Sequence, residues 1–166
     1  MEKAHYAMEA VIDVLSEYER ERGKPMPTLN HAIIQANLIF ALKLQYRQQY
    51  SIVSEINLTM PIRPDTVPDV AIYPTLKIDF LHDVTSMTAM PLTIIEIVSP
   101  SQSDAEILAK FERYFNAGVG SCWLVLPSLQ AIAVYTGIGK YQFFTDTTTL
   151  TDPSTGINLA LTEIFV

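Results

Sequence analysis

Apolar residues recur at helical spacing in two segments near the N-terminus. Residues 4–22 carry apolar side chains three and four positions apart, which predicts a helix that Gly23 ends. A second helix is predicted after Asn30, a residue type that suits an N-cap, and covers residues 31–49 with one buried face. The chain is therefore expected to begin with two helices.

The pattern then changes to that of β-strands. Residues 50–58 alternate between apolar and polar side chains, and residues 69–73 form a second, shorter strand. Residues 75–90 give no strong signal and are expected to form a loop. Residues 92–98, LTIIEIV, are apolar apart from Glu96, which is typical of a strand buried on both faces.

The second half of the chain combines one helix with further strands. Residues 104–117 follow a stretch rich in capping residues and repeat apolar side chains at helical spacing, and Gly118 suits a left-handed helix end. The remaining predicted elements are a buried strand at 121–126, a hairpin of 131–136 with 140–145, and a short strand or turn near 161–166. This order of elements predicts one α/β (α+β) domain over residues 1–166, with a mixed sheet.

Composition is that of an ordinary globular protein. The 166 residues match the size of one domain, and the 49% hydrophobic residues suffice for a core. No apolar run reaches the roughly 18 residues of a membrane span, and the N-terminal segment lacks the apolar stretch of a signal peptide. The single cysteine, Cys122, suits a reducing compartment. These features predict a soluble, cytoplasmic protein with no membrane contact.

The charge balance argues against general nucleic-acid binding. The 18 acidic residues outnumber the 11 basic ones, which gives a net charge of -7. Nucleic-acid binding depends largely on the neutralisation of phosphates by lysine and arginine. We therefore expect no tight, general DNA binding, although a local basic patch would still permit contact.

Glu96 is the strongest candidate for chemistry. A carboxylate within LTIIEIV is costly to bury unless it is paired or binds a metal, so the alternative is a salt bridge or hydrogen bond to a neighbouring strand. Asp69, at the start of its short strand, would by itself be interpreted as a turn residue. Together with Glu96 on an adjacent strand, it could hold one hard cation such as Mg²⁺.

Lys110 and His31 are weaker candidates. Lys110 follows Glu96 on the next helix, where Glu106, four residues earlier, favours a surface ion pair. The functional alternative directs its ammonium over the strand ends, where it would orient water and offset phosphate charge. His31 is either a polar residue at a helix start or a group that faces the site. The sequence contains no zinc-type Cys/His spacing and no phosphate-binding glycine motif.

Five short segments are distinctive in combination. They are GKPMPTLNHAIIQANL (23–38), PDV (68–70), EIVSPSQSD (96–104), KFERYFNAGV (110–119) and CWLVLP (122–127). In this order they span most of the chain. Together they resemble the Uma2 family (DUF820) of restriction-endonuclease-like proteins.

The resemblance implies the PD-(D/E)XK nuclease fold, a mixed central sheet flanked by helices with a metal site at one end. Carried onto this chain, Asp69 and Glu96 match the two acids of the motif, and the main-chain carbonyl of Ile97 matches a third oxygen on the metal. The usual lysine would stand at residue 98, which here is Val98. In this family the lysine comes from the following helix, at the position of Lys110.

The same resemblance implies an activity. Mg²⁺ or Mn²⁺ held by Asp69 and Glu96 would polarise a DNA phosphate and activate a water that Lys110 positions. DNA contact is expected to be weak or transient, and the protein is expected to be a homodimer because two strands need two sites. Two other functions remain open: a catalytically inactive oligomeric or DNA-associated accessory protein, and a hydrolase of a small phosphorylated substrate.

Overall fold

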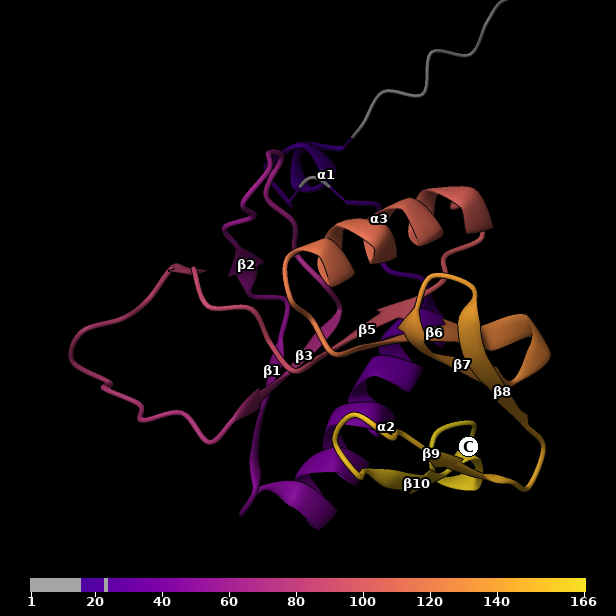
Figure 1. Cartoon of the computed structure of the whole chain (residues 1–166). Coiled ribbons are helices and arrows are strands. Elements are labelled where there is room, and N and C mark those ends of the chain that lie inside the picture. The colour runs from indigo at the N-terminus through magenta and orange to yellow at the C-terminus, as the bar shows by residue number, and fades with distance from the viewer. Residues whose placement is uncertain (1–15, 23) are drawn as a thin grey trace, which may run out of the picture.

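The computed structural model describes residues 16–22 and 24–166, in which a central sheet lies between two helices (Figure 1). In chain order the elements are α1 (Glu17–Arg22), α2 (Leu29–Tyr46), β1 (Tyr50–Ser54), β2 (Asn57–Leu58), β3 (Val70–Pro74), β4 (Ser86–Met87), β5 (Thr93–Ile97), α3 (Asp104–Asn116), β6 (Ser121–Leu126), η1 (Pro127–Leu129), β7 (Ala131–Gly137), β8 (Lys140–Thr145), β9 (Thr149–Thr151), β10 (Asn158–Ala160) and η2 (Leu161–Glu163). The six-stranded sheet has the order β1-β3-β5-β6-β7-β8, and only its β5/β6 pair is parallel. The predicted mixed sheet flanked by helices is confirmed.

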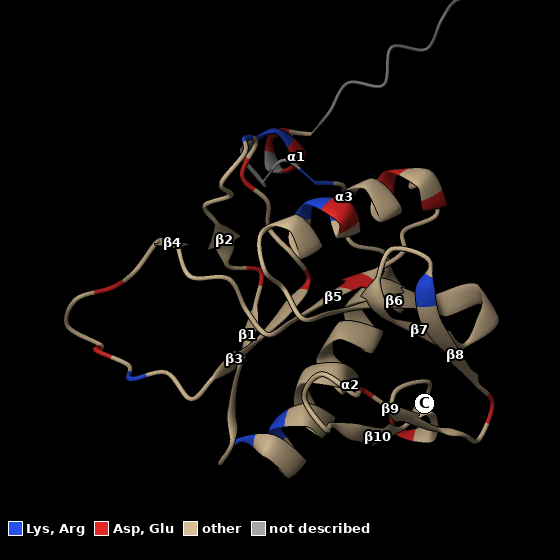
Figure 2. Cartoon of the chain, in the orientation of Figure 1, with Lys and Arg blue, Asp and Glu red and all other residues tan. Residues whose placement is uncertain are grey.

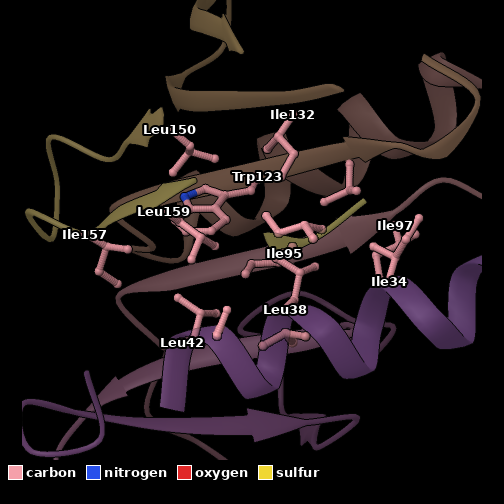
Figure 3. Packing of buried hydrophobic residues seen from close by; sticks show 14 of the residues in the cluster. Ile34, Leu38, Leu42, Ile95, Ile97, Trp123, Ile132, Leu150, Ile157 and Leu159 are labelled. Carbon is pink, nitrogen blue, oxygen red and sulfur yellow. The ribbon is translucent and has the colours of Figure 1, made fainter. Parts of the chain in front are cut away.

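The two faces of the sheet are covered by different helices. Along β5, Ile95 and Ile97 belong to the apolar cluster that includes Leu38 of α2, whereas Ile94 belongs to the cluster that includes Phe111 of α3. Figure 3 shows the α2 side chains packed against the strands. Each fully buried side chain of this size contributes about 1.5–3 kcal/mol through removal of apolar surface from water. Burial on both faces is therefore what selects the nearly all-apolar sequence of β5.

The helices agree with the sequence pattern except at their ends. Of the first predicted helix, residues 17–22 are helical, and residues 4–15 lie outside the described part of the chain. The second helix begins at Leu29 rather than after Asn30, because the Thr28 hydroxyl caps it by accepting a free backbone N–H of the first turn, that of His31, at 3.3 Å. The end of α3 is as expected, with Gly118 in the left-handed region at φ 100°.

The predicted strand at 50–58 is two strands. Glu55 has φ 51°, a left-handed conformation that ends β1 and turns the chain out of the central sheet. The following strand β2 pairs in parallel with β4, which lies inside the segment 75–90 that was expected to be a loop throughout. Pairs this short have almost no apolar periodicity, so the pattern could not indicate them.

The C-terminal segment contains the turn expected near residues 161–166, together with a hairpin that the pattern did not predict. The strands β9 and β10 form a hairpin before residue 161, and the segment expected to be a strand or turn near 161–166 begins with the 3-10 turn η2.

The central strand β6 carries Cys122, whose thiol is fully buried, and burial raises its pKa well above the usual value. No helix within residues 16–22 and 24–166 is both long and apolar enough for a bilayer crossing.

Candidate active site

Asp69 and Glu96 come together because two neighbouring strands run in opposite directions. Asp69 immediately precedes β3, and β3 pairs with β5 so that Val70 lies opposite Ile95. The start of β3 therefore meets the end of β5, where Glu96 stands. Only 2% of Asp69 and 5% of Glu96 is exposed, so both carboxylates are buried at this end of the sheet.

Both carboxylate oxygens of Asp69 have partners. The Lys24 ammonium lies 2.7 Å from Oδ1, while Oδ2 accepts a hydrogen bond from the Ile97 backbone N–H at 2.7 Å and lies 3.2 Å from His31 Nε2. Burial opposes the charged form of Asp69, but the hydrogen bond from His31 and the charge of Lys24 outweigh it and lower the pKa of this carboxyl. Asp69 is therefore held as a carboxylate.

Glu96 has a different environment, although it lies beside Asp69. The Tyr114 hydroxyl donates a hydrogen bond to its Oε1 at 2.8 Å, and the Lys110 ammonium lies 3.8 Å from the same oxygen. Burial raises the pKa of Glu96 to about 7; the Lys110 charge opposes this shift, and the nearby negative charge of Asp69 adds to it. Two adjacent carboxylates thus have pKa values shifted in opposite directions.

The Lys110 ammonium lies near Glu96, whereas its expected surface partner is bonded elsewhere. Glu106, its expected surface partner, closes a capping box instead: Glu106 Oε2 accepts from the Ser103 N–H at 3.1 Å, and Ser103 Oγ accepts from the Glu106 N–H at 3.3 Å. The Lys110 side chain is 31% exposed and contacts Glu96. The structure therefore brings together all three residues that the sequence singled out.

Lys24 is part of the same cluster and was missed in the sequence. Its ammonium lies 3.5 Å from Glu55 Oε1 in addition to its short contact with Asp69, and only 14% of its side chain is exposed. Burial alone would lower the pKa of this ammonium, but the charge and hydrogen bond of Asp69, together with the charges of Glu96 and Glu55, outweigh burial and raise it. A lone lysine in a proline-rich segment gives no signal of this role, because its partners lie 31 and 45 positions away.

Neutral side chains hold the two acids in place. Tyr114, which helical spacing assigned to the core, is buried as expected. Its hydroxyl bonds both to Thr66 Oγ1, at 2.9 Å, and to Glu96. On the other side of the sheet, Gln35 of α2 donates from Nε2 to the main-chain carbonyl of Asp69 at 2.9 Å. Each acid is thus fixed to one of the two helices that cover the sheet.

Metal ligation can be judged from the donor atoms. Within residues 16–22 and 24–166, no group of three or more His, Cys, Asp and Glu side chains is arranged to hold an ion. Two carboxylates do adjoin one another, and the Nδ1 atom of His31 is buried without a hydrogen-bond partner in the described part of the chain. Mg²⁺ commonly takes one or two carboxylates and keeps several waters. The site therefore fits a partly hydrated hard cation and does not fit a cage made of protein ligands alone.

Comparisons with known proteins identify a family and a fold for this chain. The sequence matches the profile of the Uma2 family, described as "Putative restriction endonuclease", over residues 15–162. No curated protein matches the sequence. A crystal structure described as "a putative nuclease belonging to DUF820 from Anabaena variabilis" shares the fold, with a TM-score of 0.72, 21% identity, and coverage of 85% of this chain and 83% of that one.

A second solved structure, a cryo-electron-microscopy structure of the "DrdV-DNA complex", is only weakly similar. Its TM-score is 0.37 at 11% identity, with coverage of 68% of this chain and 12% of that one. Similarity at this level does not establish a shared fold.

Proposed function

This chain belongs to the Uma2 family, and we propose that it is a metal-dependent nuclease that hydrolyses DNA phosphodiester bonds. The observation that carries the proposal is the pair of buried carboxylates, Asp69 and Glu96, at one end of the sheet with two lysine ammoniums beside them. Burying like charges together is costly, and such arrangements occur mainly where a site needs them.

The carboxylates of Asp69 and Glu96 are the proposed ligands of Mg²⁺ or Mn²⁺, with the main-chain carbonyl of Ile97 as a further oxygen. The Ile97 backbone lies next to the acids, since its N–H bonds to Asp69 Oδ2 at 2.7 Å. When bound, the ion would polarise the scissile phosphate and lower the pKa of a water. Metal loading requires the Glu96 proton to leave, which its pKa of about 7 permits near neutral pH.

The two lysines have separate proposed tasks. Lys110 is the more exposed of the two, so its ammonium can meet a substrate phosphate, offset the charge that builds up there and orient the attacking water. Lys24 keeps Asp69 ionised when no metal is bound, through its 2.7 Å contact with Oδ1. Tyr114 fixes the rotamer of Glu96 by donating to Oε1.

DNA contact is proposed to be weak or transient. The net charge of -7 repels a polyanion, and Figure 2 shows acidic and basic positions interspersed over the visible elements rather than a single basic face. Local attraction would come from the site lysines and the metal itself. Cleavage should therefore weaken steeply as salt concentration rises.

The test is incubation of supercoiled plasmid with the wild-type protein, a Glu96→Gln variant and a Glu112→Gln control in Mg²⁺ or Mn²⁺. Glu112 is an exposed acid on the same helix as Lys110, so its substitution changes the net charge equally and leaves the site intact. We expect nicked or linear plasmid from the wild type and the control, and none from Glu96→Gln or in excess EDTA. Equal loss of plasmid with all three proteins would contradict the assigned site.

One observation favours a second candidate function. Both Asp69 oxygens are already bonded, and the described residues contain no group of three acidic, histidine or cysteine ligands. This suits a catalytically inactive accessory protein of the same fold. Mn²⁺ calorimetry separates the candidates: no binding together with intact plasmid supports the accessory protein, whereas binding without cleavage favours a small phosphorylated substrate over DNA.

A further inference from the structure

A long segment between β3 and β4 leaves the body of the molecule with its apolar side chains uncovered. We name residues 77–85, all of them exposed, the arm; the segment extends away from the sheet (Figure 1). Phe80 is 96% exposed and Leu81 85%, and Ile78 and Val84 are each 58% exposed. Single exposed apolar residues are common, but several large ones in nine positions mark a contact surface.

The tip of the arm has a defined local structure. Asp79 Oδ1 accepts hydrogen bonds from the backbone N–H groups of Leu81 at 2.9 Å and His82 at 3.3 Å, and Asp79 Oδ2 lies 2.9 Å from His82 Nδ1. An aspartate that bonds to the backbone two residues on stabilises a turn. Phe80 and Leu81 are therefore presented on a preformed turn, which reduces the conformational entropy that binding would cost.

A groove of about 570 Å³ lies at the base of the arm. The outer face of α2 contributes Phe40 and Leu44, which are 69% and 67% exposed, and β1, the edge strand of the central sheet, lines another side. Leu76 and Ile78, at the arm's own base, line the groove as well. The groove thus combines apolar and basic side chains on its α2 side, and residues 79–85 of the arm are not among those that line it.

The charges of the two surfaces are complementary. Lys43 and Arg47 border the groove, and both are exposed. The arm carries Asp79 and Asp83, with Lys77 at its base. An acidic, apolar-tipped arm and a basic-rimmed, apolar groove on the same chain match one another.

We propose that the arm of one copy binds in the groove of a second copy, so that the protein is a two-fold dimer with exchanged arms. In a two-fold contact each copy offers the same two surfaces, and both unpartnered apolar regions become covered at once. The groove borders the base of its own arm, so the two arms would lie next to each other at the dimer axis. This proposal does not depend on nuclease activity, although a dimer would place two acidic sites in one particle.

The experiment measures molar mass by light scattering and by sedimentation over a dilution series of the full chain. An arm variant, Phe80→Ser with Leu81→Ser, and a groove variant, Phe40→Ser, are compared with Leu129→Ser, an exposed leucine outside both surfaces. We expect dimers for the wild type and Leu129→Ser, and monomers for both of the other variants at concentrations where the wild type is dimeric. Circular dichroism checks that each variant is folded.

Mixing the two monomeric variants gives the decisive result. The arm variant retains its groove and the groove variant retains its arm, so an equal mixture should regain one of the two contacts and form heterodimers. Arg47→Glu, which keeps every apolar contact, should weaken dimerisation at low salt and covers the case in which a serine variant fails to fold. Three results would overturn the proposal: a monomeric wild type, an arm variant that remains dimeric, or a mixture that stays monomeric. A monomeric wild type would indicate that the arm binds a different protein.

Discussion

Asp152 and the pair formed by Asp69 and Glu96 are all buried carboxylates, but their partners differ in charge. Asp152 Oδ2 accepts hydrogen bonds from Ser121 Oγ at 2.6 Å and Trp123 Nε1 at 2.8 Å, and its Oδ1 accepts from the Ser154 N–H at 2.8 Å. These donors are neutral. At the other site the partners include two lysine ammoniums and a second carboxylate.

The difference distinguishes an acid held by neutral donors from the acids of the proposed site. Neutral donors fixed on β6 hold the Asp152 side chain in one place and tie the β9–β10 hairpin to the central sheet. The acidic pair is instead held in a state that another cation or a proton can change, with pKa values shifted in opposite directions. Burial alone therefore does not mark a site, whereas buried acids with charged partners and shifted pKa values are candidates for one.

The largest expected contrast is in catalysis. Glu96→Gln should lower the rate of plasmid cleavage by a factor on the order of 10²–10³, because loss of a metal ligand removes several kcal/mol of transition-state stabilisation. Asp152→Asn should leave the rate per folded molecule unchanged. The measurement is initial nicking rate normalised to the folded fraction, and a similar loss in both variants would remove the distinction between the two regions.

The free energy of unfolding, in contrast to catalysis, should depend strongly on Asp152. Asp152→Asn replaces one acceptor oxygen with an NH₂ group that faces other hydrogen-bond donors. Buried donors then lose their acceptor, and each unsatisfied donor costs about 1–3 kcal/mol. We expect a loss of roughly 3 kcal/mol in the free energy of unfolding, measured in urea. Glu112→Gln serves as the control and should stay within about 0.5 kcal/mol of the wild type. An unchanged midpoint for Asp152→Asn would show that its hydrogen bonds contribute little.

The pH dependence of the free energy of unfolding should report the titration of Glu96. Its pKa is raised from 4.5 to about 7, so between these values the folded protein binds a proton that the unfolded chain has released. The free energy of unfolding of the metal-free protein should therefore fall as pH rises through this window, by on the order of 3 kcal/mol. Asp69, whose pKa is lowered, acts in the opposite sense, and its contribution is lost as pH falls below its usual range.

A flat profile for Glu96→Gln between these pH values, with unfolding in EDTA followed by circular dichroism, would assign the slope to this carboxyl. A slope that persists in Glu96→Gln would place its origin elsewhere in the chain.

The smallest expected effect concerns Lys24. In the proposed metal site its ammonium would compete with the ion for Asp69 Oδ1, so Lys24→Met should tighten Mn²⁺ binding about tenfold, or about 1.4 kcal/mol. Calorimetry with Mn²⁺ measures the affinity directly and does not require turnover. Lys140→Met, which removes an exposed lysine from β8, is the matched control. Weaker binding in Lys24→Met would instead indicate that the ammonium assists the metal.

The sequence predicted the parts of the site that follow from local pattern. A single acid in an otherwise apolar strand identified Glu96, and regular helical spacing placed Lys110 on α3. Family resemblance was needed for Asp69, which alone suggested a turn residue. It was also needed for the site role of Lys110, because spacing alone favoured a surface ion pair with Glu106. Lys24 and Asp152 could not be predicted, since their partners are brought near only by the folded chain. The two-residue strands β2 and β4 could not be predicted for a related reason, because their pairing joins segments 29 residues apart.

The single cysteine gives the protein an internal reporter of its own opening. Cys122 is fully buried in β6, which lies between β5 and β7 in the central sheet. Burial raises the pKa of its thiol far above neutrality. The thiolate is the form that attacks alkylating reagents, so the native state should resist alkylation and modification should require unfolding of the central sheet. Timed alkylation followed by mass spectrometry would then read out the lifetime of the folded sheet in a cell lysate, with no added label or tag.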